Sequence, residues 1–493
     1  MRELSASQRA AHQEKAARDT LVAARRLCPE AAHDAPPDCL GVEVDLGRLD
    51  FIDSRWDAAL GHLKPVLPEL AAKAAGTEDQ AAAYELLASL HASRNETDQA
   101  LKHFEQAIAI RESMWGKNSA RIAQTHLRFG RTLWTLRQLS QAEAELEKAW
   151  RISSTTLGPK HVLSARIEAN LGRLQFYLGI SPEGLPHLEH ARQALHRQRS
   201  RIDPIEIFQV QVLWANALVL DGHLARARDE LAEAMNLHSR LKTHAGPDVT
   251  LDVSQARWLI DTGQFAEGRQ ILERLRDSAI ARSGPKHPDV ADRRSRLAQA
   301  WLASGEPIRA EAELAAAMDT QDAAETQFGS PQHRAQLVLL ALRLAQGRYD
   351  LAATLATSLE QGAQKTPRRE QLREALVQMH SAVGRTWAGT GRHADADVHL
   401  VKAIELLDAA NPDHPGLVEL RAYRAQNLAA THGGARACEE LARAQTLLAK
   451  LPMLGPQFRG AVLDAQSRIR CARAPLLAAR SMSLDPNGPT ANR

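Results

Sequence analysis

The chain has 493 residues, of which 44% are hydrophobic but only 4% aromatic, and its formal net charge is +3. A single hydrophobic core stops growing at about 250–300 residues, so a chain of this length either divides into domains or extends as a linear array. The near-neutral charge, without a long basic run, argues against nucleic-acid binding. No apolar stretch reaches the roughly 20 residues that cross a membrane.

The N-terminal segment, residues 1–39, is predicted to form one polar helix over 3–27, followed by a linker that contains Pro36 and Pro37. Its first residues lack the apolar core of a secretion signal. These features predict a cytoplasmic protein. A periplasmic location is the alternative if the chain is part of a larger membrane-anchored signalling protein.

The central segment, residues 40–455, repeats with a period of about 42 residues. Each unit is predicted as two antiparallel helices, and the ten units begin near residues 40, 81, 123, 165, 208, 249, 291, 333, 377 and 418. A small residue recurs early in the second helix, at Ala59, Ala100, Ala142, Gly184, Ala227, Gly268, Ala310, Ala352, Ala396 and Ala437. Twelve residues earlier, the first helices carry Gly47, Ala88, Gly130, Gly172, Ala215, Ala256, Ala298, Leu340, Gly384 and Ala425. Because helix separation depends on side-chain size at the contact, the two series predict close packing within each pair.

The connections between helices also repeat. Gly305, Gly347 and Gly391 stand between the first and second helices of their units, where a left-handed residue typically ends a helix. Histidines recur at one place in the loops before first helices, at His161, His287, His333 and His414. This recurrence predicts a shared structural role, the capping of the helix start.

One unit shows the repeat most clearly, at Tyr84, Leu87, Ala88, Ala100, Phe104 and Ala107. The loops between units follow a Gly-Pro-x-His-Pro pattern at 158–162, 284–288 and 411–415. At these positions the chain resembles the tetratricopeptide repeat family, in the 42-residue variant of kinesin light chains and many bacterial signalling proteins. The resemblance implies an all-α fold, a right-handed solenoid of about ten antiparallel helix pairs. It implies binding but specifies no partner.

The C-terminal end is predicted to cap the array. Residues 456–474 read as a final helix that covers the apolar surface of the last unit, as terminal repeats require. Residues 475–493 are predicted to be a disordered tail.

The four cysteines lie near the two ends of the chain, Cys28 and Cys39 at one and Cys438 and Cys471 at the other. The favoured interpretation is four buried, reduced side chains, which behave as small hydrophobic residues. Two disulfides between sequence neighbours are the alternative in an oxidising compartment.

No motif for catalysis stands out. Phosphate-binding glycine loops, kinase motifs and the Gly-x-Ser-x-Gly nucleophile are absent from the sequence. His187, His190 and His196 share one predicted helix, but no Glu-x-x-His or Cys completes a metal site. The sequence therefore predicts no enzyme activity, no cofactor and no metal.

In the family that the chain resembles, the first helices line a concave face, with positions 2, 5, 9 and 12 of each unit directed inward. Position 9 is polar in most units, at Arg131, Arg173, Asn216, Arg257, Gln299, Arg385 and Gln426. The candidate peptide-binding set also includes nearby Trp134, Asn170, Phe176 and Tyr177. Arginine binds carboxylates with paired N–H groups, and aromatic side chains often anchor a ligand. The set predicts a groove for an extended acidic segment; an ordinary solvent-facing row is the alternative.

The predicted function is a non-enzymatic scaffold or sensor module, of bacterial signalling type, that binds a protein or peptide partner in this groove. We expect no nucleic-acid partner and no membrane insertion by the chain itself. One alternative is the detached C-terminal repeat region of a bacterial serine/threonine kinase or winged-helix regulator. The other is an enzyme whose unrecognised site is assembled across repeats.

Overall fold

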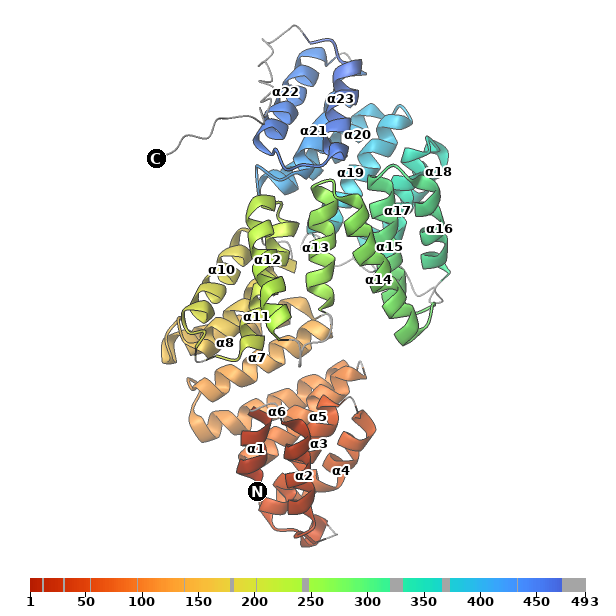
Figure 1. Cartoon of the computed structure of the whole chain (residues 1–493). Helices are drawn as coiled ribbons and strands as arrows, with labels where there is room; N and C mark the ends of the chain where they lie inside the picture. Colours follow the sequence, from red (N-terminus) through yellow and green to blue (C-terminus); the bar gives the residue numbers. More distant parts are fainter. Residues whose placement is uncertain are drawn as a thin grey trace, which may run out of the picture. The chain divides into compact units, whose positions relative to one another are not determined.

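The computed structural model describes residues 1–10, 13–29, 32–53, 55–94, 96–136, 138–177, 181–200, 202–241, 248–319, 331–365, 373–431 and 433–471. Every regular element in these ranges is helical, which confirms the predicted fold class, and consecutive helices pack in pairs (Figure 1). The chain forms two compact units, Met1–Gln255 and Ala256–Arg493, called unit 1 and unit 2 below. The predicted tail, 475–493, lies outside the described residues.

Unit 1 begins with two short helices and continues as stacked pairs, ending within α13. Thr77 and Ser119 begin their helices by accepting a backbone N–H with the side-chain hydroxyl, which satisfies a donor that the first turn leaves open. The helices are α1 (Arg2–Ala10), α2 (Glu14–Arg25), η1 (Ala32–Asp34), α3 (Pro37–Ile52), α4 (Trp56–Lys73), α5 (Glu78–Ser93), α6 (Thr97–Trp115), α7 (Ala120–Thr135), α8 (Leu139–Thr156), α9 (Val162–Tyr177), α10 (Ser181–Arg197), α11 (Pro204–Leu220), α12 (Leu224–Arg240) and α13 (Val249–Asp261).

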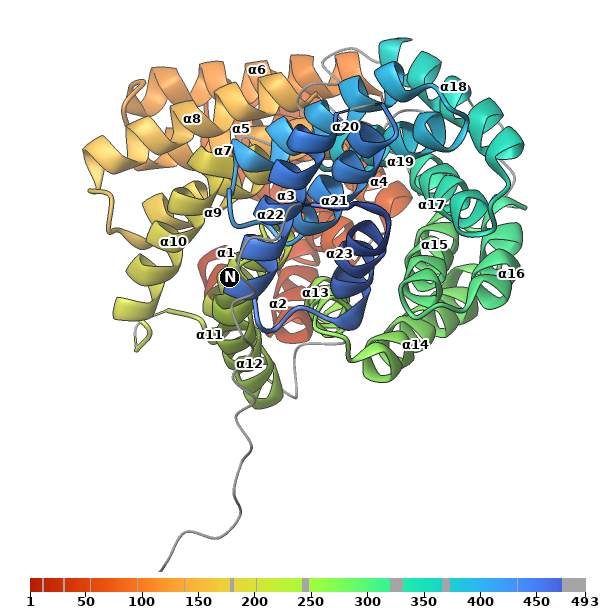
Figure 2. The ribbon, with the colours of Figure 1, turned by 90° about the horizontal axis from the view of Figure 1, so that it is seen from above.

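Unit 2 comprises the second half of α13 and the helices that follow it. Figure 2 shows α15 and α17, the first helices of their pairs, inside α16 and α18, so the first helices form the inner side of this unit. The remaining helices are α14 (Phe265–Ser283), α15 (Pro288–Ala303), α16 (Pro307–Met318), α17 (Pro331–Ala345), α18 (Tyr349–Lys365), α19 (Arg373–Gly389), α20 (His393–Asp408), α21 (Gly416–Ala429), α22 (Gly434–Lys450) and α23 (Pro456–Arg468).

The N-terminal segment differs from the single helix expected over residues 3–27. It forms two helices, α1 and α2, that pack on each other, and α2 packs on α3. The Ser5 hydroxyl donates to the carbonyl oxygen of Ala17 across this pair. Leu21 is fully buried against Leu46 and Leu49 of α3. One straight helix would leave this sparse apolar face in water, whereas folding back buries it.

The small residues pack as predicted. A Cβ atom on Gly172 would lie 2.8 Å from the carbonyl oxygen of Gly184, and one on Gly184 would lie 2.8 Å from that of Gly172. A Cβ on Gly130 would lie 2.8 Å from Cγ of Leu146. The turn glycines also take the left-handed backbone, with φ of +78° at Gly305, +70° at Gly347 and +81° at Gly391.

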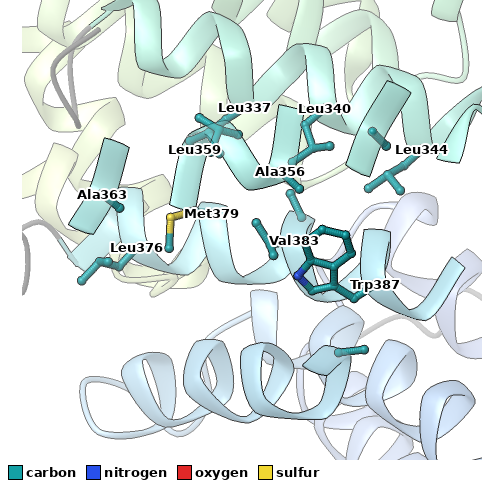
Figure 3. Packing of buried hydrophobic residues seen from close by; sticks show 13 residues of the cluster. Leu337, Leu340, Leu344, Ala356, Leu359, Ala363, Leu376, Met379, Val383 and Trp387 are labelled. Carbon is teal, nitrogen blue, oxygen red and sulfur yellow. The ribbon is translucent and has the colours of Figure 1, made fainter. Parts of the chain in front are cut away.

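Leu340 is the exception in the small-residue series, and its neighbour compensates. In two other units glycine on the first helix meets leucine on the second: Gly130 meets Leu146, and Gly384 meets Leu400. In the pair α17 and α18 the sizes are exchanged: Leu340 is fully buried in a cluster with Ala352 and Ala356, and Ala356 stands where other units have Leu or Phe (Figure 3). The total volume is kept, which packed cores tolerate well.

Three of the recurring loop histidines cap helix starts, which confirms that prediction for them. The Nδ1 atom accepts a backbone N–H two residues later at His161 (3.1 Å), His287 (3.2 Å) and His414 (3.0 Å). For His333 the prediction is wrong. It lies inside α17, only 3% exposed, where burial and the charge of Arg334 lower its pKa to about 4.

Both cysteine pairs form disulfides, Cys28–Cys39 and Cys438–Cys471, with Cα atoms 5.7 and 5.6 Å apart. The favoured prediction of four reduced side chains is therefore wrong, and the alternative pairing is correct. Sequence spacing could not decide this, because Cys28 reaches Cys39 only after α2 folds back onto α3. Within the described ranges, no helix combines the length and apolar character needed to cross a membrane.

The last helix, α23, closes unit 2 on its first helix. The backbone N–H of Gly455 donates to the carbonyl oxygen of Asp261 at 2.9 Å. The side-chain amide of Gln457 donates to the carbonyl oxygen of Ile260, also at 2.9 Å. The Cys438–Cys471 disulfide links the other end of this segment to α22. The C-terminal segment is thus fixed at both ends.

Candidate functional site

Three of the candidate residues lie together in unit 1. Arg131 and Trp134 belong to α7, and Arg173 occupies the place of Arg131 one repeat later, on α9. The guanidinium carbon of Arg173 is 4.6 Å from the centre of the Trp134 ring, a cation–π distance. Phe176, also on α9, is partly buried, and the side chain of Tyr177 lies outside the described residues.

The two arginines of this group are close enough for their charges to interact. Desolvation by neighbouring atoms and the positive charge of Arg131 lower the pKa of Arg173, while the negative charge of Asp248 opposes this shift. In the part of the chain that the structure describes, neither guanidinium has a carboxylate within 4.0 Å. Two positive charges held together without a carboxylate in direct contact favour the binding of an anion.

The two candidate asparagines of unit 1 already bond within the protein. The side-chain N–H of Asn170 donates to the carbonyl oxygen of Arg166 at 2.8 Å, within α9. The side-chain oxygen of Asn216 accepts from the hydroxyl of Ser254 at 2.8 Å, which links α11 to α13. Each amide retains further hydrogen-bonding capacity. Neither amide adds charge to the arginine pair.

Arg257 differs from Arg131 and Arg173 because its charge is neutralised. Its Nη1 donates to Oε1 of Glu374 at 2.7 Å, and its Nε lies 3.8 Å from Asp261 on the same helix. It also belongs to unit 2, whereas the other two arginines belong to unit 1. Of these three candidate arginines, the structure brings Arg131 and Arg173 together with no carboxylate of the described residues in contact with them.

Glu374, in the first turn of α19, lies within a cluster of arginines. Arg334 and Arg296 both pair with Asp292, at 3.0 and 2.8 Å. Desolvation by neighbouring atoms would raise the pKa of the Glu374 carboxyl. The positive charges of Arg257, Arg334 and Arg296 have the larger effect and lower this pKa to about 2. The Glu374 carboxylate is therefore strongly favoured at neutral pH.

The candidate Arg385 lies at a more acidic part of the inner side. Its guanidinium carbon is 4.3 Å from the centre of the Tyr423 ring. Burial raises the pKa of the Glu419 carboxyl to about 7; Arg385 opposes this shift, and the charge of Asp261 adds to it. Burial and the charge of Glu419 raise the pKa of Tyr423 to about 12.

The two remaining candidates in unit 2 are glutamines. The amide of Gln426 on α21 donates to Asp464 of α23 at 2.9 Å, and Gln299 on α15 is exposed. Inside unit 2, therefore, Arg257, Arg385 and Gln426 make contacts with other residues of the protein.

Charged residues on the inner side of unit 2 extend beyond the candidate set. Position 2 of the repeat is also expected to point inward, and in three repeats of unit 2 it is charged, at Asp292, Arg334 and Glu419. These residues could therefore be identified from the sequence by considering position 2 together with position 9. Glu374 carries no such signal. It precedes position 2 of its own repeat, Gln378, by four residues, and only the folded structure brings it to Arg257.

The described residues include no group of three or more His, Cys, Asp or Glu side chains that could hold a metal ion. The chemistry that these faces offer is charge-assisted hydrogen bonding and stacking on aromatic rings. Such groups bind ligands by charge and shape.

The fold is shared with several solved structures. A Rap protein complexed with the competence and sporulation factor has a TM-score of 0.55 at 14% identity, with 76% of this chain and 99% of that one covered. NprR in complex with its cognate peptide NprX has a TM-score of 0.51 at 15% identity, covering 73% and 96%. The peptide-free quorum sensor NprR from B. thuringiensis has a TM-score of 0.46 at 13% identity, covering 74% and 97%. At these identities the likeness to the Rap protein and to the NprR–NprX complex shows the fold alone.

A comparison with curated protein sequences finds no match. A family model does match: residues 80–120, which comprise α5, α6 and the turn after them, fit the tetratricopeptide repeat. This segment includes Tyr84, Ala100 and Phe104, the positions at which the sequence shows the repeat most clearly. The chain is thus a helix-pair array with the tetratricopeptide-repeat fold, and residues 80–120 are a tetratricopeptide repeat.

Proposed function

We propose that this chain is a non-catalytic scaffold for protein–protein interaction, and that unit 1 binds an acidic segment of its partner along α7 and α9. The observation that carries the proposal is the pair Arg131 and Arg173, held together beside Trp134 with no carboxylate of the described residues within 4.0 Å of either guanidinium. An aspartate, a glutamate or a terminal carboxylate would supply the missing negative charge. The Trp134 ring offers an apolar surface next to it.

The solved structures of similar fold support a binding function in general terms. The Rap protein is complexed with the competence and sporulation factor, and NprR is in complex with its cognate peptide. The arginine pair narrows the proposal to a segment with negative charge. The inner side of unit 2 is a weaker candidate for the same ligand, because Arg257 is already paired with Glu374.

The test compares wild type with the double variant Arg131→Ala/Arg173→Ala. Lysate from the native host is passed over each immobilised protein, and a captured partner is titrated against both. Charge-assisted hydrogen bonds contribute about 1.5–3 kcal/mol each, so loss of both arginines should weaken binding by more than about tenfold. Exposed substitutions shift stability by about half a kcal/mol or less, so the fold should persist.

A matched control removes two arginines from the second helices instead. Arg151 on α8 and Arg197 on α10 are both exposed, and Arg151→Ala/Arg197→Ala changes the net charge by the same amount. This control should bind as wild type does. Equal weakening in both double variants would mean that net charge alone attracts the partner, and unchanged binding in the first would place the site elsewhere.

The two disulfides bear on location. Disulfides persist in oxidising compartments and are rare in the cytosol, so Cys28–Cys39 and Cys438–Cys471 favour an oxidising compartment such as the periplasm as the working place of the chain. Thiol trapping in intact cells, followed by mass spectrometry, tests this. All four cysteines should resist alkylation until a reductant is added; four labelled cysteines without reductant would reject it.

A further inference from the structure

We propose that unit 2 carries a second carboxylate-binding site, formed by Arg257, Arg296 and Arg334, which Glu374 occupies as an internal ligand until an acidic peptide displaces it. The site uses different residues from the arginine pair of unit 1 and does not rest on it.

The three arginines come from three successive first helices, α13, α15 and α17, and the carboxylate comes from a fourth, α19. Arg257 donates directly to Glu374 at 2.7 Å. The charges of Arg296 and Arg334 also act on this carboxylate. Convergence of cations from separate helices on one carboxylate is the arrangement by which proteins hold an acidic ligand. Here the ligand group belongs to the chain itself.

Glu374 is placed so that it can leave. Its side chain is 46% exposed, and it stands in the first turn of α19, one residue after the helix begins. Among the described residues, its carboxylate accepts hydrogen bonds from Arg257 and, at 3.3 Å, from the amide of Gln378 on the same helix. Water screens the charges of a half-exposed ion pair and weakens it, so a competing carboxylate can displace Glu374.

Within the group of these three arginines and the three carboxylates that pair with them or act on them, the charges balance only while Glu374 is present. Arg257, Arg296 and Arg334 carry three positive charges, and Asp261, Asp292 and Glu374 carry three negative ones when ionised. Asp292 is shared by Arg296 and Arg334, and Asp261 lies 3.8 Å from Arg257. Withdrawal of Glu374 leaves one net positive charge, which one carboxylate of a ligand would neutralise. The site therefore takes a single acidic group.

The experiment uses the full chain and a fluorescein-labelled acidic hexapeptide, once with a free C-terminal carboxylate and once amidated. The key variant is Glu374→Gln, which keeps the shape of the side chain and removes its charge. If Glu374 fills the site about nine-tenths of the time, this variant should bind the peptide about tenfold more tightly than wild type. If Glu374→Gln binds the amidated peptide no more tightly than wild type does, the site takes a terminal carboxylate. If the tighter binding persists with the amidated peptide, the site takes an acidic side chain.

Three further proteins make the result specific. Glu374→Gln/Arg257→Gln should lose the gain, because the main donor is gone. Glu311→Gln removes a carboxylate that pairs with Arg343 at 2.9 Å from α16, a second helix, and should leave the affinity unchanged. The gain should persist in the Arg131→Ala/Arg173→Ala background, which separates this site from that of unit 1.

Unchanged or weaker peptide binding by Glu374→Gln would overturn the proposal, as would an equal gain in Glu311→Gln. Circular dichroism checks that each variant is folded. Should Glu374→Gln unfold, Glu374→Asp serves in its place, because the shorter side chain keeps its charge and reaches Arg257 less well. It should tighten binding by a smaller factor, and no tightening in a folded Glu374→Asp would again reject the site.

Discussion

The side-chain amide of Gln457 donates a hydrogen bond of 2.9 Å to the carbonyl oxygen of Ile260, 197 residues earlier. The main-chain bond from Gly455 to Asp261 lies beside it. In a simple solenoid each repeat contacts only its neighbours, and stability is a sum of local terms. Unit 2 adds a contact between its first and last helices, so its repeats should unfold together more than those of an open array.

This contact predicts an unusually large effect at Gly263. Its backbone is left-handed, with φ of +86°, and a Cβ atom there would lie 2.8 Å from Cδ of Pro456. Gly263→Ala should lower the free energy of unfolding of unit 2 by about 2–4 kcal/mol, of which the backbone conformation accounts for about 1–2 kcal/mol. Denaturant unfolding measures the change.

Gly305 supplies the control for that experiment. Its φ is +78°, but no atom lies within 4 Å of the position of an added Cβ. Gly305→Ala should therefore show the backbone effect alone. Equal losses in the two variants would mean that the docking of the C-terminal segment on the turn after α13 contributes nothing.

The Cys438–Cys471 disulfide is predicted to hold the docked segment in place. The double variant Cys438→Ser/Cys471→Ser should lower the free energy of unfolding by about 2–4 kcal/mol, because the unfolded chain gains freedom. Hydrogen exchange should also quicken in α23 and at Gly455. The Cys28→Ser/Cys39→Ser variant should leave exchange in α23 unchanged. If exchange in α23 is the same with and without the Cys438–Cys471 bond, the hydrogen bonds alone fix the segment.

Much of the fold follows from the sequence because it depends on contacts within one repeat. The close approach of Gly172 and Gly184, the left-handed turn at Gly305 and the cap at His287 each involve residues of a single unit or connection. Such features recur with the period and can be read from it. The exchange of side-chain size between Leu340 and Ala356 can also be read from the sequence. Leu340 is the large residue in a series of Gly and Ala, and Ala356 is the small residue in a series of Leu and Phe.

The candidate site was less predictable because charge pairing depends on how the repeats curve. The period of about 42 residues places Arg131, Arg173 and Arg257 at equivalent positions. Only the folded structure shows that Glu374 reaches Arg257, whereas no carboxylate among the described residues reaches the other two. The pairing of Gln457 with Ile260 likewise needs the curvature of unit 2. Sequence periodicity identifies which face of a helix points inward, but it does not identify the residues of distant repeats that this face contacts.

A buried ion pair in unit 1 supplies a further prediction. Arg111 is 4% exposed and donates to Glu78 at 2.7 Å, to Thr125 at 2.9 Å and to Glu85. Arg111→Met keeps most of the side-chain volume but leaves Glu85 buried with only part of its positive surroundings, the ion pair with Arg128 and the charge of Arg48. The free energy of unfolding should fall by about 3 kcal/mol or more.

The double variant Arg111→Met/Glu85→Gln separates lost charge pairing from lost packing. It removes the buried carboxylate as well, so it should recover part of the stability that Arg111→Met loses. Chemical unfolding of wild type, both single variants and the double variant gives the coupling energy. A coupling near zero would mean that the pairing of Arg111 with Glu85 contributes nothing, and that Arg111 stabilises unit 1 through packing and its bonds to Glu78 and Thr125.

The last prediction concerns the pH dependence of stability at Glu419. Its pKa in the folded protein is about 7, above the ordinary 4.5, so between these values the folded state binds more protons than the unfolded chain. Stability should therefore fall as pH rises from about 4.5 to 7. Arg385, Asp261 and Tyr423 face this carboxyl, and Asp261, with a pKa raised to about 6, contributes in the same direction.

Glu419→Gln should remove about 1–2 kcal/mol of that fall, since one pKa unit corresponds to about 1.4 kcal/mol and the side chain keeps some contact with water. Thermal or urea unfolding at half-unit steps from pH 4 to 8 measures the slope. Glu374 provides the opposite case, because the pKa of its carboxyl is lowered to about 2. The stabilising effect of this carboxylate is present above pH 4.5 and is lost as pH falls from 4.5 towards 2, and Glu374→Gln should remove it. The two variants should thus alter different pH windows with opposite signs. If Glu419→Gln follows the wild-type slope between pH 4.5 and 7, the carboxyl is not held in its neutral form, and the acidic part of the inner side is open to water.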